Sequence, residues 1–233
     1  MNAALMLAFA ATLVAGVPVA FTMVVGGFAA VLARGSIDPI AGVQQMFAGI
    51  DSFPLMAIPF FILAAEIMTG GALTEVLLRF ARQLVGHIRG GLGHTTILTL
   101  TFFSGISGSA LADAAGPGRM LFTMMKKAGY GEGYSASLVA SVSLLGPIIP
   151  PSILMIVYAL TEPSVTIMGM FFGGVVPGLM IASGFLAYNH FISGRRGYRF
   201  ADERATPREL ARGFVLALPA LLMPVIILGG IHL

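Results

Sequence analysis

The sequence contains no cysteine and no tryptophan, and only 10% of its 233 residues are charged. Without cysteine the chain cannot be a disulfide-stabilised scaffold. The charged fraction is less than half of the roughly 25% that is usual in globular proteins, so too few charged side chains are present to cover a soluble surface. An ordinary soluble enzyme is therefore excluded, and so little soluble surface also argues against a nucleic-acid partner.

Hydrophobic residues are abundant instead, at 57% of the chain with a mean hydropathy of +0.94. This composition predicts an all-α polytopic membrane protein rather than a disordered chain. A membrane span needs about 20 apolar residues, and the candidate stretches are residues 2–33, 52–70, 92–112, 134–160, 164–192 and 213–233. The first has Gly16-Val17-Pro18 near its middle and no basic residues ahead of it. We expect it to be one kinked or tilted span, not a signal peptide.

The positions of the basic residues predict a topology. Suppose that residues 92–112 enter and leave on the same face of the membrane, while every other apolar stretch crosses once. Arg34 then lies alone on one face, and all other basic residues share the opposite face: Arg79, Arg82, Arg89, Arg119, Lys126, Lys127, Arg195, Arg196, Arg199, Arg204, Arg208 and Arg212. Because positive charge marks the cytoplasmic face, residues 92–112 are predicted to be re-entrant from the cytoplasm.

Residues 72–89 have a different pattern from the spans. Apolar side chains recur there at helical spacing, with charged and polar ones opposite; the apolar set is Leu73, Val76, Leu77, Phe80, Leu84 and Ile88. This pattern predicts an amphipathic helix in the cytoplasmic interface. The alternative is a solvated extension of the preceding span.

Two segments inside the apolar stretches are poor helix formers. Residues 104–110 read Ser-Gly-Ile-Ser-Gly-Ser-Ala, a run that disfavours a helix centre and offers hydroxyl and carbonyl oxygens suited to a small cation such as Na⁺. Close packing of helices through small residues is the alternative explanation of this run.

The second segment, residues 146–152, reads Gly-Pro-Ile-Ile-Pro-Pro-Ser. Its three prolines remove three amide donors, which predicts two half-helices meeting near the middle of the membrane. A simple proline kink explains one proline better than three. We expect the two broken segments to face each other across one oxygen-lined cavity.

Asp113 follows the first broken segment by four residues. An acidic residue near membrane depth indicates a functional site by default, although Asp113 could instead cap a helix. The string Gly105-Ile106-Ser107-Gly108 also fits the G-x-S-G pattern of intramembrane serine proteases. A serine nucleophile needs a base within hydrogen-bond reach, and His94 lies roughly 15 Å away along a helix, which weighs against an enzyme.

At these residues the sequence resembles a known family, the large membrane subunit of TRAP (tripartite ATP-independent periplasmic) transporters of the C4-dicarboxylate and sialic-acid type. The resemblance is carried by residues 53–55, 57–64, 90–92, 104–110, 129–130, 146–152 and 177–178. It implies an elevator-type carrier of the bacterial inner membrane with multiple spans, in which a transport domain moves against a fixed scaffold. It also implies a small four-helix membrane subunit and a periplasmic substrate-binding protein as partners. Uptake of a carboxylate substrate would be driven by Na⁺, without ATP or another cofactor.

The resemblance also implies site residues. Sodium would be bound by Ser104 and Ser107, together with the backbone oxygens of Gly146, Ile149 and Pro151. Possible contacts to the ion or to the substrate carboxylate are Ser109, Asp113 and Ser152. No catalytic residue and no metal other than Na⁺ is expected.

Members of this family consist of two inverted halves, whereas this chain has one serine-rich hairpin and one Pro-Pro break. We therefore expect the N-terminal half of the architecture, with the second ion site in the other half; a structural fragment that does not transport is the alternative. The expected parts are a scaffold with the amphipathic helix (1–90), a transport-domain part (91–162) and further spans (163–233). The middle part would contain the hairpin (92–118) and the broken helix (133–161), and the last part a basic cytoplasmic loop (194–212).

Overall fold

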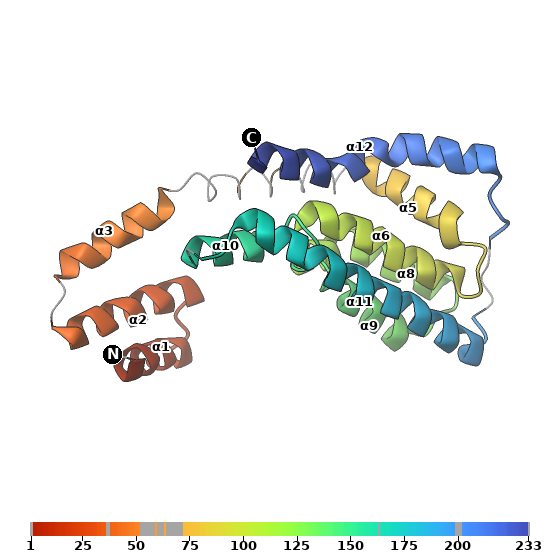
Figure 1. Ribbon diagram of the computed structural model, residues 1–233. Coiled ribbons are helices and arrows are strands. Elements are labelled where there is room, and N and C mark those ends of the chain that lie inside the picture. Colours follow the sequence, from red (N-terminus) through yellow and green to blue (C-terminus); the bar gives the residue numbers. More distant parts are fainter. Residues whose placement is uncertain are drawn as a thin grey trace. The chain divides into compact units, whose positions relative to one another are not determined.

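The computed structural model describes residues 2–35, 38–51, 59, 63, 72–162, 164–198 and 202–232 (Figure 1). Within these ranges all regular secondary structure is helical and no strand occurs, which agrees with the all-α prediction. The chain divides into two compact units, Met1–Leu55 and Met56–Leu233. Most of the expected span 52–70, with Glu66 and most of the matching residues 53–64, lies outside the described residues.

The first unit contains α1 (Asn2–Val14), α2 (Val19–Arg34) and α3 (Pro39–Ile50). Between α1 and α2 the chain reverses at Gly16, whose φ is +79°, a conformation that few other residues adopt. A Cβ on Gly26 would lie 3.4 Å from both the Leu5 carbonyl oxygen and the Phe9 Cβ, so α2 packs back against α1. The prediction of a single kinked span is therefore wrong, because the Gly-Pro segment forms a complete turn between two short helices.

The second unit begins with α5 (Ala72–Val85), which occupies most of the predicted amphipathic helix. Its apolar side packs on α6 and α12. Leu77 and Phe80 are buried there with Phe103 of α6 and Ala217 of α12. The apolar stripe therefore contacts protein.

A helical hairpin follows. Its first arm is α6 (Gly91–Ser107). Its second arm consists of three helical segments that follow one another without a break: α7 (Ala110–Asp113), the π-helical turn η1 (Ala114–Gly118) and α8 (Arg119–Lys127). Only Gly108 and Ser109 leave the helical conformation at the turn, with Gly108 at φ +60°. The sequence predicted disruption over residues 104–110, which is too long. Ser104 remains within the regular part of α6, and its hydroxyl lies 2.8 Å from the Leu100 carbonyl of the same helix.

The remaining helices are α9 (Glu132–Ser143), α10 (Ile153–Thr161), α11 (Ile167–Arg196) and α12 (Pro207–His232). Residues 144–152 separate α9 from α10 and form turns, so the interruption begins two residues before the predicted segment 146–152. Among the described residues, one helix, α11, is long and apolar enough to cross a membrane.

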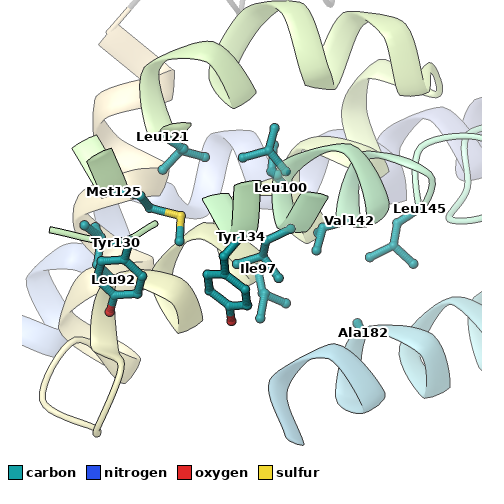
Figure 2. Close-up of a cluster of buried hydrophobic side chains, with 12 residues drawn as sticks. Leu92, Ile97, Leu100, Leu121, Met125, Tyr130, Tyr134, Val142, Leu145 and Ala182 are labelled. Atoms are coloured by element: carbon teal, nitrogen blue, oxygen red, sulfur yellow. The ribbon is translucent and has the colours of Figure 1, made fainter. Parts of the chain in front are cut away.

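The main hydrophobic core lies between the hairpin, α9 and α11 (Figure 2). It joins Ile97 and Leu100 of α6 with Leu121 of α8 and Val142 of α9, and Ala182 of α11 completes it. This core holds the hairpin and the first half of the broken helix together, and so it determines how their ends meet.

Candidate cation site

The turn of the hairpin lies directly against the interruption between α9 and α10. We call residues 107–110 the hairpin tip and residues 144–152 the unwound segment. A Cβ on Gly108 would lie 2.5 Å from the Pro151 carbonyl oxygen, and a Cβ on Gly146 would lie 2.8 Å from the Ser109 carbonyl carbon. Both distances are too short for any side chain, so the two backbones touch through glycine at two points. The two interruptions predicted from the sequence therefore do face each other.

Three polar side chains form a buried cluster at the hairpin tip. Ser107 Oγ donates a hydrogen bond to Asp113 Oδ1 at 2.5 Å, and Ser104 Oγ lies 3.0 Å from Asp113 Oδ2. Ser104 and Asp113 are 0% exposed and Ser107 is 4% exposed. The backbone of the unwound segment covers this cluster, because a Cβ on Gly146 would lie 3.1 Å from Asp113 Oδ2. The cluster thus offers hydroxyl and carboxylate oxygens, the hard donors that small cations prefer.

The unwound segment adds backbone oxygens. Within the described residues, the carbonyls of Gly146, Ile149 and Pro151 accept no hydrogen bond, and the same holds for those of Ile148 and Pro150. The Pro147 carbonyl is the exception, since it accepts from Ser152 Oγ at 2.8 Å. Gly146, Pro150 and Pro151 are buried residues, and buried carbonyls are almost always paired, so unpaired oxygens at these three positions are unusual. The unpaired carbonyls of the unwound segment include the three that the family resemblance implies as ligands.

The other two serines have local structural roles. Ser109 precedes α7, and its Oγ accepts a hydrogen bond from the Ala112 amide at 3.4 Å. Ser152 precedes α10, and its Oγ accepts a hydrogen bond from the Met155 amide at 3.3 Å. Both are helix N-caps, a position in which serine is strongly favoured. The amide ends of two helices therefore begin at the same junction between the hairpin tip and the unwound segment.

A second polar cluster, which the sequence did not predict, joins α11 to the start of the hairpin. Asn189 is fully buried; its Oδ1 accepts from the Tyr134 hydroxyl at 2.7 Å, and its Nδ2 donates to the Gly90 carbonyl at 3.3 Å. An amide inside an apolar stretch is the signal that could have identified it. His94 lies at this end of α6 and packs against His190, with 6.0 Å between ring centroids. His94 is thus at the opposite end of α6 from Ser107.

Comparison with known proteins decides the family. Residues 6–233 match the family described as "Tripartite ATP-independent periplasmic transporter, DctM component". The chain belongs to this family. The family resemblance noted in the sequence is confirmed.

Named relatives span several substrates. The sialic acid TRAP transporter large permease protein SiaM of Vibrio cholerae is 38% identical over 219 residues, covering 94% of this chain and 51% of the relative. The isethionate TRAP transporter permease protein DctMQ of Oleidesulfovibrio alaskensis is 39% identical over 225 residues, covering 96% and 35%. The 2,3-diketo-L-gulonate TRAP transporter large permease protein YiaN of Escherichia coli is 36% identical over 215 residues, covering 92% and 50%.

The chain spans about half the length of the large permease relatives it matches, SiaM and YiaN. These relatives are transporter permeases, so the chain is not an enzyme and the protease alternative is set aside.

Proposed function

We propose that this chain forms a Na⁺-binding half of a secondary transporter that imports organic acids. The observation that carries the proposal is the contact between the hairpin tip and the unwound segment. At that contact the buried cluster of two serine hydroxyls and a carboxylate lies beside an unwound segment whose carbonyls at Gly146, Ile149 and Pro151 accept no hydrogen bond among the described residues. Broken helices of this kind form the ion sites of secondary transporters at the middle of the bilayer.

In this proposal each oxygen has a role. The hydroxyls of Ser104 and Ser107 and the carbonyls of Gly146, Ile149 and Pro151 bind the coupling ion. The N-terminus of α10, which Ser152 caps, is the element suited to the substrate's acid group, because helix N-termini attract anions. Ser109 caps α7 on the opposite side of the same junction and is the second candidate for that contact.

The relatives' names support the class of substrate and partners. Sialic acid, isethionate and 2,3-diketo-L-gulonate each carry an acid group, so we propose a small organic acid for this chain as well. The family is tripartite by name, and we propose a small membrane subunit and a periplasmic binding protein as its partners. We further propose an elevator mechanism in a multi-pass protein of the bacterial inner membrane, with residues 91–162 in the moving part and residues 1–90 in the scaffold.

The test is uptake by the intact transporter that contains this chain, reconstituted into liposomes with its partner subunits and an imposed Na⁺ gradient. Ser107→Ala removes one proposed ligand and is expected to raise the Na⁺ concentration for half-maximal uptake about tenfold. Ser135→Ala is the matched control, since Ser135 is also buried and its hydroxyl donates to the carbonyl of Gly131, the residue that caps α9. An unchanged Na⁺ dependence in Ser107→Ala would contradict the proposed site.

A further inference from the structure

Asp113 lies at the centre of the buried cluster, although the backbone and hydroxyl ligands alone could complete an ion site. We infer that Asp113 is a positioning residue of the cation site: its carboxylate orients the hydroxyls of Ser104 and Ser107 and supplies the negative charge that balances the bound cation. This inference rests on the proposed function and assigns a role to a residue that the proposed ligand set leaves without one.

The first argument for this role comes from the hydrogen bonds that Ser104 and Ser107 make to Asp113. A serine hydroxyl has one proton and two lone pairs, so an oxygen that faces a cation must give its proton to an acceptor on the other side. Ser107 lies 2.5 Å from Asp113 Oδ1 and 3.4 Å from its next acceptor, the Ser109 carbonyl, so its proton goes to Asp113. Ser104 has two acceptors, Asp113 at 3.0 Å and the Leu100 carbonyl at 2.8 Å. Asp113 therefore sets the direction of the Ser107 proton and in part that of the Ser104 proton, while the Ser109 amide donates to Ser107 Oγ at 3.3 Å.

The second argument is that Asp113 has no cationic partner among the described residues. Two ion pairs occur among the described residues, Arg82 with Asp202 and Lys126 with Glu132, and neither includes Asp113. A fully buried carboxylate without a cationic partner is costly, while a cation held only by hydroxyls and carbonyls would leave a buried positive charge. Placing both in one cluster removes both costs. The structure therefore fits a monovalent cation better than a neutral ligand.

The local backbone shows how the chain holds Asp113 in place. The π-helical turn η1 begins directly after Asp113 and contains Pro117, which has no amide to donate to the Asp113 carbonyl. A Cβ on Gly118 would lie 2.8 Å from both that carbonyl oxygen and Val139 Cγ1, so α9 packs closely at this point. Single π-helical turns are frequent at functional sites. Here the turn sets Asp113 between the two serines of α6 and the backbone of Gly146.

The experiment measures Na⁺ binding without transport. The intact transporter that contains this chain is purified, and its melting temperature is followed by circular dichroism as NaCl replaces choline chloride at constant ionic strength. Asp113→Asn keeps the size of the side chain and removes its charge. We expect the apparent dissociation constant for Na⁺ to rise by about 100-fold, more than in Ser107→Ala, because a full charge next to the ion is lost. Asp202→Asn is the matched control, a carboxylate-to-amide change in an ion pair away from the cluster.

The outcomes separate this inference from the proposed function. If the unmodified protein shows no stabilisation by Na⁺, the proposed function fails. If the unmodified protein responds, Ser107→Ala responds weakly and Asp113→Asn responds normally, the ion site stands and the role of Asp113 is overturned. Should Asp113→Asn fail to fold, Asp113→Glu and Asp113→Gln give the same comparison with equal side-chain volume. Only the glutamate is then expected to retain a Na⁺ response, and equal responses of the two overturn the inference.

Discussion

Gly108→Ala tests the contact on which the whole site depends. Gly108 has φ +60°, and a Cβ on it would lie 2.5 Å from the Pro151 carbonyl oxygen and 3.2 Å from Ser152 Cα. Both neighbours are backbone atoms of the unwound segment, so no side chain can rotate away to make room. The substitution must therefore push the hairpin tip and the unwound segment apart.

The expected cost has two parts. A non-glycine residue in the left-handed conformation costs about 1–2 kcal/mol, and forcing an extra carbon into a packed contact costs about 1–3 kcal/mol more. Gly108→Ala should thus lower the free energy of unfolding by about 2–5 kcal/mol. For a chain of this size that corresponds to a decrease in melting temperature of about 10 °C.

The assay is thermal unfolding followed by circular dichroism, with Gly129→Ala as the matched control. Gly129 has φ +82°, but a Cβ there would meet no atom within 4 Å, so only the conformational cost applies. We expect a decrease of about 4 °C in this control. If Gly108→Ala destabilises the protein no more than Gly129→Ala does, the hairpin tip and the unwound segment are not in contact and the site as described does not exist.

Three further predictions concern the rest of the second unit. Asp202→Asn removes an ion pair whose side chains, Arg82 and Asp202, are 43% and 26% exposed. We therefore expect the free energy of unfolding to fall by less than about 1 kcal/mol, and this difference to disappear in high salt, as measured by denaturation at two salt concentrations. Asn189→Leu removes the acceptor of the buried Tyr134 and Ser193 hydroxyls, while the Gly90 carbonyl keeps its hydrogen bond from the His94 amide. We expect a loss of unfolding free energy of roughly 2–4 kcal/mol in the same assay, and a neutral effect would contradict this. Glu209 accepts hydrogen bonds from the amide and hydroxyl of Thr206, which lower its pKa from the ordinary value of 4.5. The stabilisation that Glu209 gives to the first turn of α12 is therefore complete above pH 4.5 and is lost as the pH falls through the lowered pKa. Hydrogen exchange of the amides in this turn, corrected for intrinsic rates, should show this loss in the unmodified protein and not in Glu209→Gln.

Local sequence signals predicted the places where helices stop. Gly108 and the prolines at 147, 150 and 151 mark the two interruptions, because neither residue type supports a continuous helix. The capping box that Thr206 and Glu209 form at the start of α12 is a local signal of the same kind. Such signals act over a few residues, which is why they can be recognised in one sequence.

Interactions between distant segments were harder to predict. Nothing local showed that α1 and α2 pack as a hairpin, since a kinked span and a turn both contain Gly16 and Pro18. The bonds of Asp113 to Ser104 and Ser107 depend on the turn at Gly108 and on η1, so the sequence indicated the residue and not its partners. The contact of Asn189 with Gly90 joins residues 99 positions apart and depends on the packing of α11.

The central claim, that Na⁺ binds where the hairpin tip meets the unwound segment, is tested most directly by experimental density for the intact transporter in NaCl and in choline chloride. The account predicts a feature in NaCl that touches Ser107 Oγ and the Pro151 carbonyl oxygen and is absent in choline chloride. Density at this junction that is identical in both salts, or a Na⁺-dependent feature only elsewhere in the chain, would contradict it.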